Sequence, residues 1–426
     1  MNYLDYPKLG EAYFEHCLPN GLRIRVIPKK DFARKHAFLA VDFGSIDTKF
    51  TLDGREYRVP DGIAHYLEHK MFDLPRDNAM NLFAEVGGSP NAFTSYSMTA
   101  YYVSCTENFE ENLRILLEMV MTPYFTPESV EKERGIIAQE IRMYEDSAES
   151  RVSEDLFGAL FAEHPVRVPI AGTVESIGEI TSEMLYACHA AFYRPSNMML
   201  CVAGDVDPNR VAELAAQWCA EATPINPVRD YGRPETMLPA KTRSECEMEI
   251  SMPTFSIGCK CEPPAAGMDA MRREIIGDLA AELLVGESSP LYLRLYEDGL
   301  IDSAFSAGYE SVKDACAVTA GGDSRDPDAV LAALLEEAER VGREGFDEAR
   351  FERLKRSEIG RRMRGLDSFE GICYRNCAYH FDGVDYYRFP DAYASVTAED
   401  VKRFIAETFQ PERMAMSVVY PKKQEE

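Results

Sequence analysis

The chain has 426 residues, 46% of them hydrophobic, and it carries a formal net charge of −26. This length predicts two or more domains, and the hydrophobic content is sufficient for buried cores. The acidic balance argues against nucleic acid and anionic membrane surfaces as partners, because phosphate binding requires clustered lysine and arginine.

The first segments of the chain predict strands followed by a helix. Apolar runs at residues 22–28 (LRIRVIP) and 36–43 (HAFLAVDF) are typical of strands. The segment IAHYLEHKMF, residues 63–72, has apolar positions at helical spacing around a polar trio. This trio reads HxxEH, the zinc-hydrolase helix signature in inverted order.

The HxxEH spacing indicates a catalytic zinc site. On an α-helix, His65 and His69 lie one turn apart on one face, so both imidazoles can reach one ion. Glu68 directly precedes the second histidine, which places its carboxylate beside the open position of the ion. A general base that activates a water belongs at that position. The alternative is a chance occurrence around structural histidines.

The segment after this helix predicts one or two strands. Residues 89–105 (SPNAFTSYSMTAYYVSC) are rich in aromatic residues, threonine and serine, and they follow the turn-forming Gly87 and Gly88. At a sheet edge, such a strand can bind an extended peptide as one further strand, through backbone hydrogen bonds. The alternative is an ordinary sheet strand.

A catalytic zinc site is usually completed by a third side chain, often a carboxylate. Residues 128–146 (ESVEKERGIIAQEIRMYED) predict a long helix that offers Glu131, Glu133, Glu140 and Glu145. Glu133 and Glu140 are seven residues apart and therefore share a face. Spacing does not choose among the four carboxylates, and the alternative is the solvated face of an acidic helix.

Together these segments resemble the pitrilysin-type (M16, inverzincin) zinc metallopeptidases, in the form of a bacterial insulinase-like or processing-peptidase-like member. The resemblance rests on HxxEH, on NAFT and on VEKERGIIAQEIRM. It implies Zn²⁺ as the cofactor, bound by His65, His69 and Glu140. It also implies that Glu68 is the catalytic base and that Glu133 is a supporting carboxylate of the catalytic site.

The resemblance further implies a substrate cleft along the edge strand, lined by Asn91, Ala92, Phe93 and Thr94. Family members often carry, in a C-terminal region, an arginine followed seven residues later by a tyrosine, and this pair helps to bind substrate. Arg294 is the comparable arginine here and is assigned to substrate binding. Ile301 stands at the expected distance, however, and Asp302 occupies the expected aromatic site. A substitute aromatic residue and a contribution from a partner chain are both open alternatives.

The chain also repeats a pattern of helix, proline and strand. Residues 180–205 and 396–421 share this pattern at a constant offset of 216 residues, which indicates a duplication. The second half contains a long helical pattern at residues 346–363 but no HxxEH. Only the first half is therefore expected to carry the zinc chemistry.

We expect an α+β fold of two homologous domains, residues 1–222 and 241–426, joined by a proline-rich linker at residues 223–240. In the resembling family, such a domain pair forms one half of a clamshell. A second chain of the same or a related type supplies the other half. The expected assembly is therefore a homodimer, or a heterodimer with a related M16-type chain.

The sequence starts without a basic and apolar leader and contains no run of eighteen apolar residues, so we expect a cytoplasmic protein without membrane insertion. The eleven cysteines lack CxxC spacing. They are expected to be free thiols, and most of them small buried side chains.

The expected function is that of a zinc-dependent metalloendopeptidase that hydrolyses peptides or unfolded polypeptide segments, with Glu68 activating a water. The alternative from another class is a catalytically idle scaffold or peptide-binding subunit of a heterodimer. A zinc hydrolase that acts on something other than peptides is a third interpretation.

Overall fold

Strands and helices alternate along both halves of the chain in the computed structural model, which describes residues 1–219 and 227–423. Residues 223–226 of the expected linker lie outside this description. The chain divides into unit 1 (Met1–Ile141, Pro169–Tyr231 and Arg362–Tyr387) and unit 2 (Arg142–Val168, Gly232–Arg361 and Arg388–Glu426). Within the described ranges, no helix is both long and apolar enough to cross a lipid bilayer.

Unit 1 is built around a seven-stranded sheet with the order β1-β2-β3-β9-β4-β8-β7, and it also contains a small sheet, β10-β5-β6. The two apolar runs predicted as strands form β3 and β4. The fully buried β9 lies between them, parallel to β3 and antiparallel to β4. Central strands are apolar on both faces because helices cover both sides. The strands are Asn2–Tyr6 (β1), Glu11–Cys17 (β2), Arg23–Pro28 (β3), Lys35–Val41 (β4), Lys49–Leu52 (β5), Arg55–Arg58 (β6), Ser89–Thr94 (β7), Thr99–Cys105 (β8), Met198–Gly204 (β9) and Val228–Arg229 (β10).

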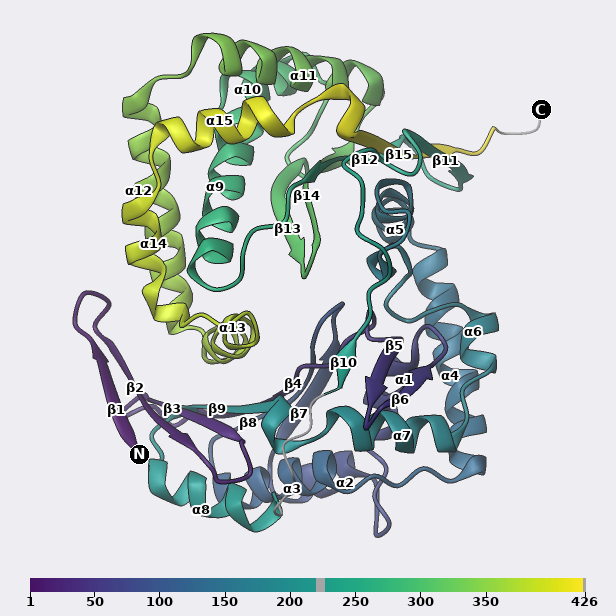
Figure 1. The fold of residues 1–426 in the computed structure, drawn as a ribbon, viewed down its shortest axis with the longest axis vertical. Coiled ribbons are helices and arrows are strands. Elements are labelled where there is room, and N and C mark those ends of the chain that lie inside the picture. Colours follow the sequence, from purple (N-terminus) through teal and green to yellow (C-terminus); the bar gives the residue numbers. More distant parts are fainter. Residues whose placement is uncertain (220–226, 424–426) are drawn as a thin grey trace. The chain divides into compact units, whose positions relative to one another are not determined.

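Helices cover both faces of the seven-stranded sheet. Figure 1 shows α13 on one face, where it contacts β4 and β9, and α3 and α8 on the other face. The helix predicted at residues 128–146 is α4, and most of it belongs to unit 1. The helices of this unit are Ile63–Lys70 (α1), Ala79–Glu85 (α2), Phe109–Met121 (α3), Pro127–Glu145 (α4), Val174–Gly178 (α6), Ser182–Phe192 (α7), Pro208–Trp218 (α8) and Phe369–Phe381 (α13).

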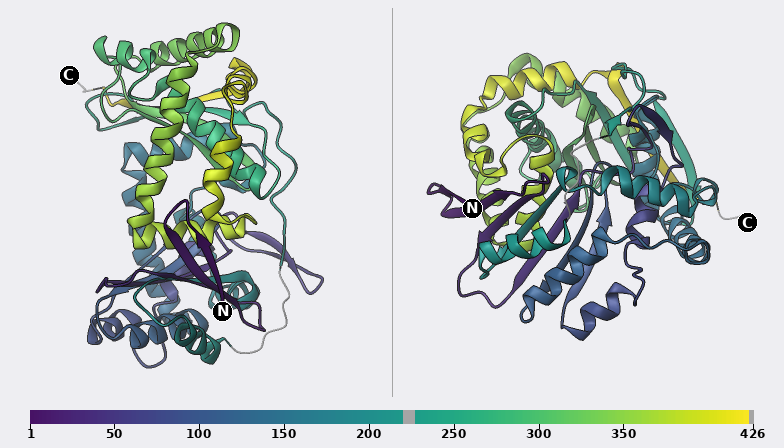
Figure 2. Two further views of the ribbon diagram at one scale, coloured as in Figure 1. Left: turned by 90° about the vertical axis from the view of Figure 1, so that its left-hand side faces the viewer. Right: turned by 60° about the horizontal axis from the view of Figure 1, so that its bottom comes forward.

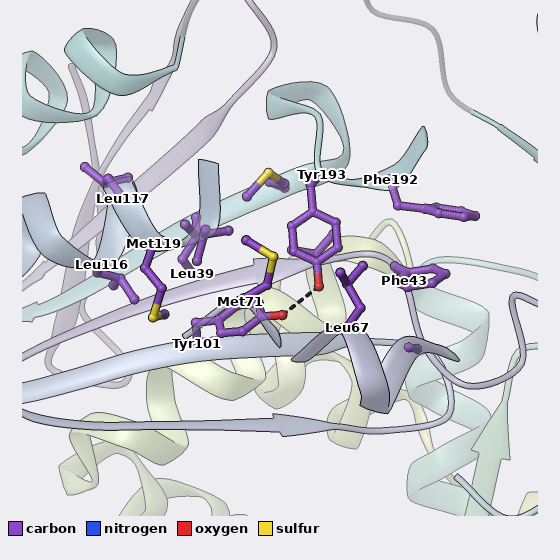
Figure 3. Close-up of a cluster of buried hydrophobic side chains, with 14 of the residues drawn as sticks. Leu39, Phe43, Leu67, Met71, Tyr101, Leu116, Leu117, Met119, Phe192 and Tyr193 are labelled. Carbon is purple, nitrogen blue, oxygen red and sulfur yellow. Dashed lines mark hydrogen bonds between the residues drawn. The ribbon is translucent and has the colours of Figure 1, made fainter. Parts of the chain in front are cut away.

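The hydrophobic core of unit 1 holds α1 in place. Figure 3 shows Leu67 and Met71 packed among apolar side chains that include Leu39 and Tyr101. The Tyr101 hydroxyl lies 2.7 Å from the Tyr193 hydroxyl, so both buried oxygens are satisfied. Each fully buried leucine or methionine contributes roughly 1.5–3 kcal/mol. Buried cysteines add to the packing as predicted, since nine of the eleven are buried.

Unit 2 is built around a five-stranded sheet with the order β11-β15-β12-β14-β13. One face is covered by α5, which contacts β11, β12 and β15, and the other by α9 and α15. The strands are Arg243–Met248 (β11), Thr254–Cys261 (β12), Ser306–Val312 (β13), Ala315–Asp323 (β14) and Met414–Pro421 (β15). The helices are Ala148–Leu160 (α5), Met268–Val285 (α9), Pro290–Glu297 (α10), Pro327–Glu344 (α11), Glu348–Arg364 (α12), Phe389–Ser395 (α14) and Ala398–Thr408 (α15).

The two sheets share one topology, which confirms the predicted duplication. When β11-β15-β12-β14-β13 is compared with β3-β9-β4-β8-β7, the first pair is parallel and each later pair is antiparallel in both. The helix and strand α15 and β15 each begin 216 residues after their counterparts α7 and β9. Thr181 and Thr397 cap the two helices in the same way, since each side chain accepts a backbone N–H bond.

One helix of each half of the chain packs on the sheet formed by the other half. The N-terminal helix α5 lies on the sheet of unit 2, and the C-terminal helix α13 lies on the sheet of unit 1 (Figures 1 and 2). Gly258 on β12 shows how closely α5 approaches, because a Cβ atom there would lie 2.6 Å from Leu160 and 3.1 Å from Leu156. Each unit therefore contains sequence from both halves.

A buried arginine of β3 fastens α13 to the sheet of unit 1. Arg25 donates to the Oδ1 atom of Asn376 on α13 at 3.0 Å and to the Oε1 atom of Glu15 at 2.9 Å. It also forms an ion pair with Asp385 at 3.5 Å. Its guanidinium lies 4.4 Å from the centre of the Tyr13 ring. Charge-assisted bonds of this kind are strong only while every partner is present.

Replacing Arg25 with methionine is therefore expected to destabilise unit 1, because Glu15 and Asp385 lose their common counter-charge. We expect a loss of about 2–4 kcal/mol, less than for a fully buried pair because both carboxylates keep some contact with solvent. The one tryptophan of the chain, Trp218, lies on α8 of unit 1, so its fluorescence during urea unfolding reports this unit. The exposed ion pair of Arg210 provides the control, Arg210→Met, and equal midpoints for the two variants would contradict the role of Arg25.

Candidate metal centre

The HxxEH helix, α1, begins at a glycine that no other residue can replace without strain. Gly62 has a φ angle of +88°, and a Cβ atom there would lie 2.4 Å from the carbonyl oxygen of Ala171. The helix then buries Leu67 and Met71 in the core (Figure 3). Because the helix has 3.6 residues per turn, the HxxEH side chains lie away from this apolar side.

His65, His69 and Glu140 meet at one point in unit 1. The Nε2 atom of His65 lies 3.6 Å from Oε1 of Glu140, and the Nε2 atom of His69 lies 3.3 Å from Oε2 of the same carboxylate. One donor atom from each of the three residues lies within 4.8 Å of the other two. Among the described residues, this is the one group of three histidine, cysteine or carboxylate side chains close enough to hold a metal ion.

The distances from the two histidine nitrogens to the Glu140 carboxylate fit zinc. Zinc bonds of 2.0–2.2 Å at tetrahedral angles place neighbouring ligand atoms about 3.4 Å apart. The observed separations of 3.3 and 3.6 Å bracket this value. Two imidazoles and one carboxylate are also a donor set that zinc accepts, and they leave its fourth position open for water or substrate.

Glu133, one of the four predicted carboxylates, contacts a histidine of this group. Its Oε1 atom lies 3.0 Å from Nδ1 of His69, so Nδ1–H can donate to it and the Nε2 lone pair is left for a metal. Burial alone would lower the pKa of His69, but the bonds to Glu133 and Glu140 outweigh it and raise this pKa to about 10. Glu131 instead pairs with Arg134 at the surface, and Glu145 is exposed.

Glu68 is buried beside this group and is held by the edge strand. Its Oε2 atom accepts a hydrogen bond from the Thr94 hydroxyl at 2.7 Å. The Thr94 hydroxyl also lies 3.5 Å from that of Thr99, which donates to the carbonyl oxygen of Phe43 at 2.8 Å. Burial raises the pKa of Glu68 above its ordinary value, and this effect exceeds the opposing influence of His65 and Thr94. A carboxylate tuned in this way is better suited to exchange protons near neutral pH.

The segment at residues 89–105 forms two strands, and the first of them lies at a sheet edge. β7 carries Asn91, Ala92, Phe93 and Thr94, and it is the last strand in the sheet order, paired with β8. Thr94 points toward α1, whereas the ring of Phe93 lies 5.9 Å from the ring of Tyr374 on α13. Successive side chains of the strand therefore reach opposite faces of the sheet.

Arg294 belongs to unit 2, whereas His65, His69 and Glu140 belong to unit 1. Arg294 is an exposed residue of α10, the helix that also carries the stacked rings of Tyr292 and Tyr296, whose centroids are 6.1 Å apart. Ile301, at the position expected for the tyrosine, is buried, and Asp302 is exposed. The assignment of Arg294 to substrate binding stays a prediction.

The contact between Thr94 and Glu68 was not predicted from the sequence. The family resemblance places Thr94 in the substrate cleft, and a separation of 26 residues between a helix and a strand carries no periodic signal. The alternation of a strand offered a partial signal, because it places Ala92 and Thr94 on one face. Which element that face meets depends on the packing of α1 against β7.

Two family models match the middle of the chain, and one relative matches nearly its whole length. Residues 54–174 match the family described as Insulinase (Peptidase family M16), and residues 179–358 match the one described as Peptidase M16 inactive domain. The Bacillus subtilis protein named uncharacterized zinc protease YmfH is 35% identical over 424 residues, covering 98% of this chain and 99% of the relative. A second protein of that organism, named uncharacterized zinc protease YmxG, is 26% identical over 335 residues, 76% of this chain and 79% of the relative.

Solved structures of similar fold also match this chain. The crystal structure of an M16-like peptidase from Alicyclobacillus acidocaldarius matches with a TM-score of 0.93 and 32% identity, over 98% of this chain and all of that chain (100%). Pitrilysin shares the fold with a TM-score of 0.75 at 18% identity, over 98% of this chain and 45% of that chain. The fold is thus α+β, with two M16 domains that correspond to one half of pitrilysin. On the identity to YmfH over the full length, the chain belongs to the M16 peptidase family.

Proposed function

We propose that the protein is a zinc-dependent metalloendopeptidase that hydrolyses peptides or unfolded polypeptide segments. The observation that carries this proposal is the grouping of His65, His69 and Glu140 at zinc-ligand spacing beside the buried carboxylate of Glu68. The relatives named zinc proteases support the same reaction class.

The proposed ligands are His65 Nε2, His69 Nε2 and the carboxylate of Glu140. Zinc held there polarises a substrate carbonyl and lowers the pKa of a bound water. Glu133 keeps the proton of His69 on Nδ1 and fixes the ring, so that Nε2 faces the ion. Glu133 therefore acts on the site through His69.

Glu68 moves the proton in the proposed reaction. Thr94 holds its Oε2 atom, so Oε1 is the oxygen that accepts a proton from the attacking water. The same carboxyl group then delivers this proton to the amine nitrogen as the peptide bond breaks. Burial of Glu68 raises its pKa, which makes the carboxylate a stronger base toward the attacking water.

The proposed substrate binds as an added strand along β7. An edge strand offers backbone N–H and C=O groups to any extended peptide, so affinity depends little on the side chains of the substrate. Thr94 lies at the end of this strand and touches Glu68, so a peptide paired with β7 runs past the proton-transfer group. This arrangement favours peptides over compact substrates.

We also propose that two chains, identical or related, act together. In pitrilysin and in the periplasmic protease PqqL of Escherichia coli, the matching part is 45% and 47% of the chain, so a second part of similar length accompanies it. The competing proposal is an idle peptide-binding subunit. The feature that favours it is Ile301, which stands where a tyrosine is expected seven residues after Arg294. One zinc per chain without cleavage of a quenched peptide library, alone or after mixing with a related chain, would establish the idle subunit.

Glu140→Gln is expected to lose zinc. A neutral amide is a poor zinc ligand, so the content measured by elemental analysis should fall from about one ion per chain to nearly none. The control Glu131→Gln changes an exposed carboxylate on the same helix and should keep the ion. Full zinc content in both variants would remove Glu140 from the ligand set.

Glu68→Gln is expected to keep zinc and lose turnover. The ligands survive while the proton acceptor is removed, so kcat should fall by about 10²–10⁴-fold. Zinc content and cleavage of the peptide library are measured on the same preparation. Turnover at the wild-type rate would overturn the assignment of Glu68 as the base.

Thr94→Val is expected to reduce kcat by about 10–100-fold without loss of zinc, because the bond that orients Glu68 is removed and such bonds to charged groups contribute roughly 1.5–3 kcal/mol. Valine has nearly the same shape as threonine, so the strand is preserved. The control Thr106→Val lies in an exposed position after β8. A rise in KM alone would mean that Thr94 contacts substrate and does not orient the base.

A further inference from the structure

Two parallel pairs of side chains project from α1. His65 and His69 form the pair at the candidate metal centre. Tyr66 and Lys70, each one residue later, form a second pair one turn apart along the neighbouring stripe of the helix. Both members of this second pair are buried, with exposed fractions of 0% and 1%.

The second pair bonds to the backbone of α4. The Nζ atom of Lys70 donates to the carbonyl oxygen of Ser129 at 3.3 Å, and the hydroxyl of Tyr66 donates to that of Val130. Ser129 and Val130 lie in the first turn of α4. The first turn of the helix that carries Glu133 and Glu140 is therefore held by the helix that carries the histidines.

Lys70 also ties the chain that follows α1 into this arrangement. Its ammonium forms an ion pair with Asp73. Asp73 in turn accepts a bond from Nδ2 of Asn78 at 3.2 Å, and Asn78 caps α2. Lys70 thus joins three segments: the end of α1, the loop before α2 and the start of α4.

A buried ammonium is costly, and an aliphatic side chain would fill the same space without that cost. The bond of Lys70 to the Ser129 carbonyl is distance-dependent, however, and it therefore restrains the first turn of α4. A slip of α4 by one residue would move Glu140 by about 1.5 Å and turn it by about 100°. Zinc ligands tolerate only about 0.2 Å, so the axial position of α4 decides whether Glu140 meets both histidines.

We propose that Lys70 is a positioning residue of the metal centre: together with Tyr66, it sets α4 so that Glu140 reaches the zinc held by His65 and His69. This inference rests on the proposed zinc site. It predicts that the loss of Lys70 weakens zinc binding far more than the loss of an equivalent lysine elsewhere.

The chain contains a matched control. Among the described residues, Lys70 and Lys260 are the two buried lysines, each 1% exposed and each paired with a carboxylate. Lys260 contacts Glu235 at 2.8 Å in unit 2 and has no part in the group around His65. Both Lys70→Met and Lys260→Met remove a buried ammonium from a carboxylate.

The experiment measures zinc affinity by competition with a chromophoric chelator, together with thermal unfolding of the metal-free proteins. Lys70→Met is expected to bind zinc about 10–100-fold more weakly, which is the usual loss when a residue that supports a metal ligand is replaced. Lys260→Met is expected to keep the wild-type affinity. The visible absorption of Co²⁺ in the site should change in Lys70→Met alone, because it reports the arrangement of ligands. A purely stabilising role would lower both unfolding temperatures and leave affinity and spectrum unchanged, which would overturn the proposal.

Two further variants keep the test decisive if Lys70→Met does not fold. Lys70→Met combined with Asp73→Asn removes both charges of the pair, and Tyr66→Phe removes a single hydroxyl. Both are expected to weaken zinc binding, and wild-type affinity in both would overturn the proposal. Wild-type protein that binds no zinc would instead overturn the proposed function and, with it, the role of Lys70.

Discussion

The candidate metal centre depends on the alignment of two helices. α1 brings two imidazoles and the carboxylate of Glu68, and α4 brings the carboxylates of Glu133 and Glu140. Within α1 the spacing follows from helix geometry alone, but between the helices nothing local sets the distance. The apolar packing of Leu67 and Met71 fixes one side of α1, and the bonds from Tyr66 and Lys70 to α4 fix the other. A site that needs donor atoms within a few tenths of an ångström therefore rests on contacts that themselves bind no metal.

These contacts explain which parts of the site could be read from the sequence. His65, Glu68 and His69 lie within five residues of one another, so a single helical turn predicts their geometry. The four carboxylates of α4 could not be ranked in this way, because every one of them is compatible with a helix. The structure brings Glu140 and Glu133 to the histidines and leaves Glu131 and Glu145 at the surface. The difference is made by the packing of one helix on another, which a sequence pattern along one helix does not contain.

The fold shows the same division. The α+β class, the strands around residues 22–43 and the repeat at 216 residues follow from periodicity, because each repeated helix and strand keeps its own local signals. Periodicity does not predict that α5 packs on the sheet of unit 2 or that α13 packs on the sheet of unit 1. Both helices have ordinary apolar faces, and nothing in such a face names the sheet that it will cover. The packing of α13 on the sheet of unit 1 is specific, since the Arg25 guanidinium donates a hydrogen bond to Asn376, which lies 351 positions later in the chain.

The exchange of α5 and α13 has a consequence for how the protein is made. A ribosome releases the strands of the first sheet, the HxxEH helix and α4 well before it reaches residues 369–381. Until α13 has emerged, one face of β4 and β9 has no helix to cover it, although every residue of the candidate metal centre has already been synthesised. The sheet of unit 2 is in the opposite situation, because α5, the helix that covers one of its faces, is synthesised before any of its strands. Nascent unit 1 must therefore remain incomplete through the synthesis of most of unit 2, and the apolar face of its sheet is the surface on which a chaperone would be expected to act during that interval.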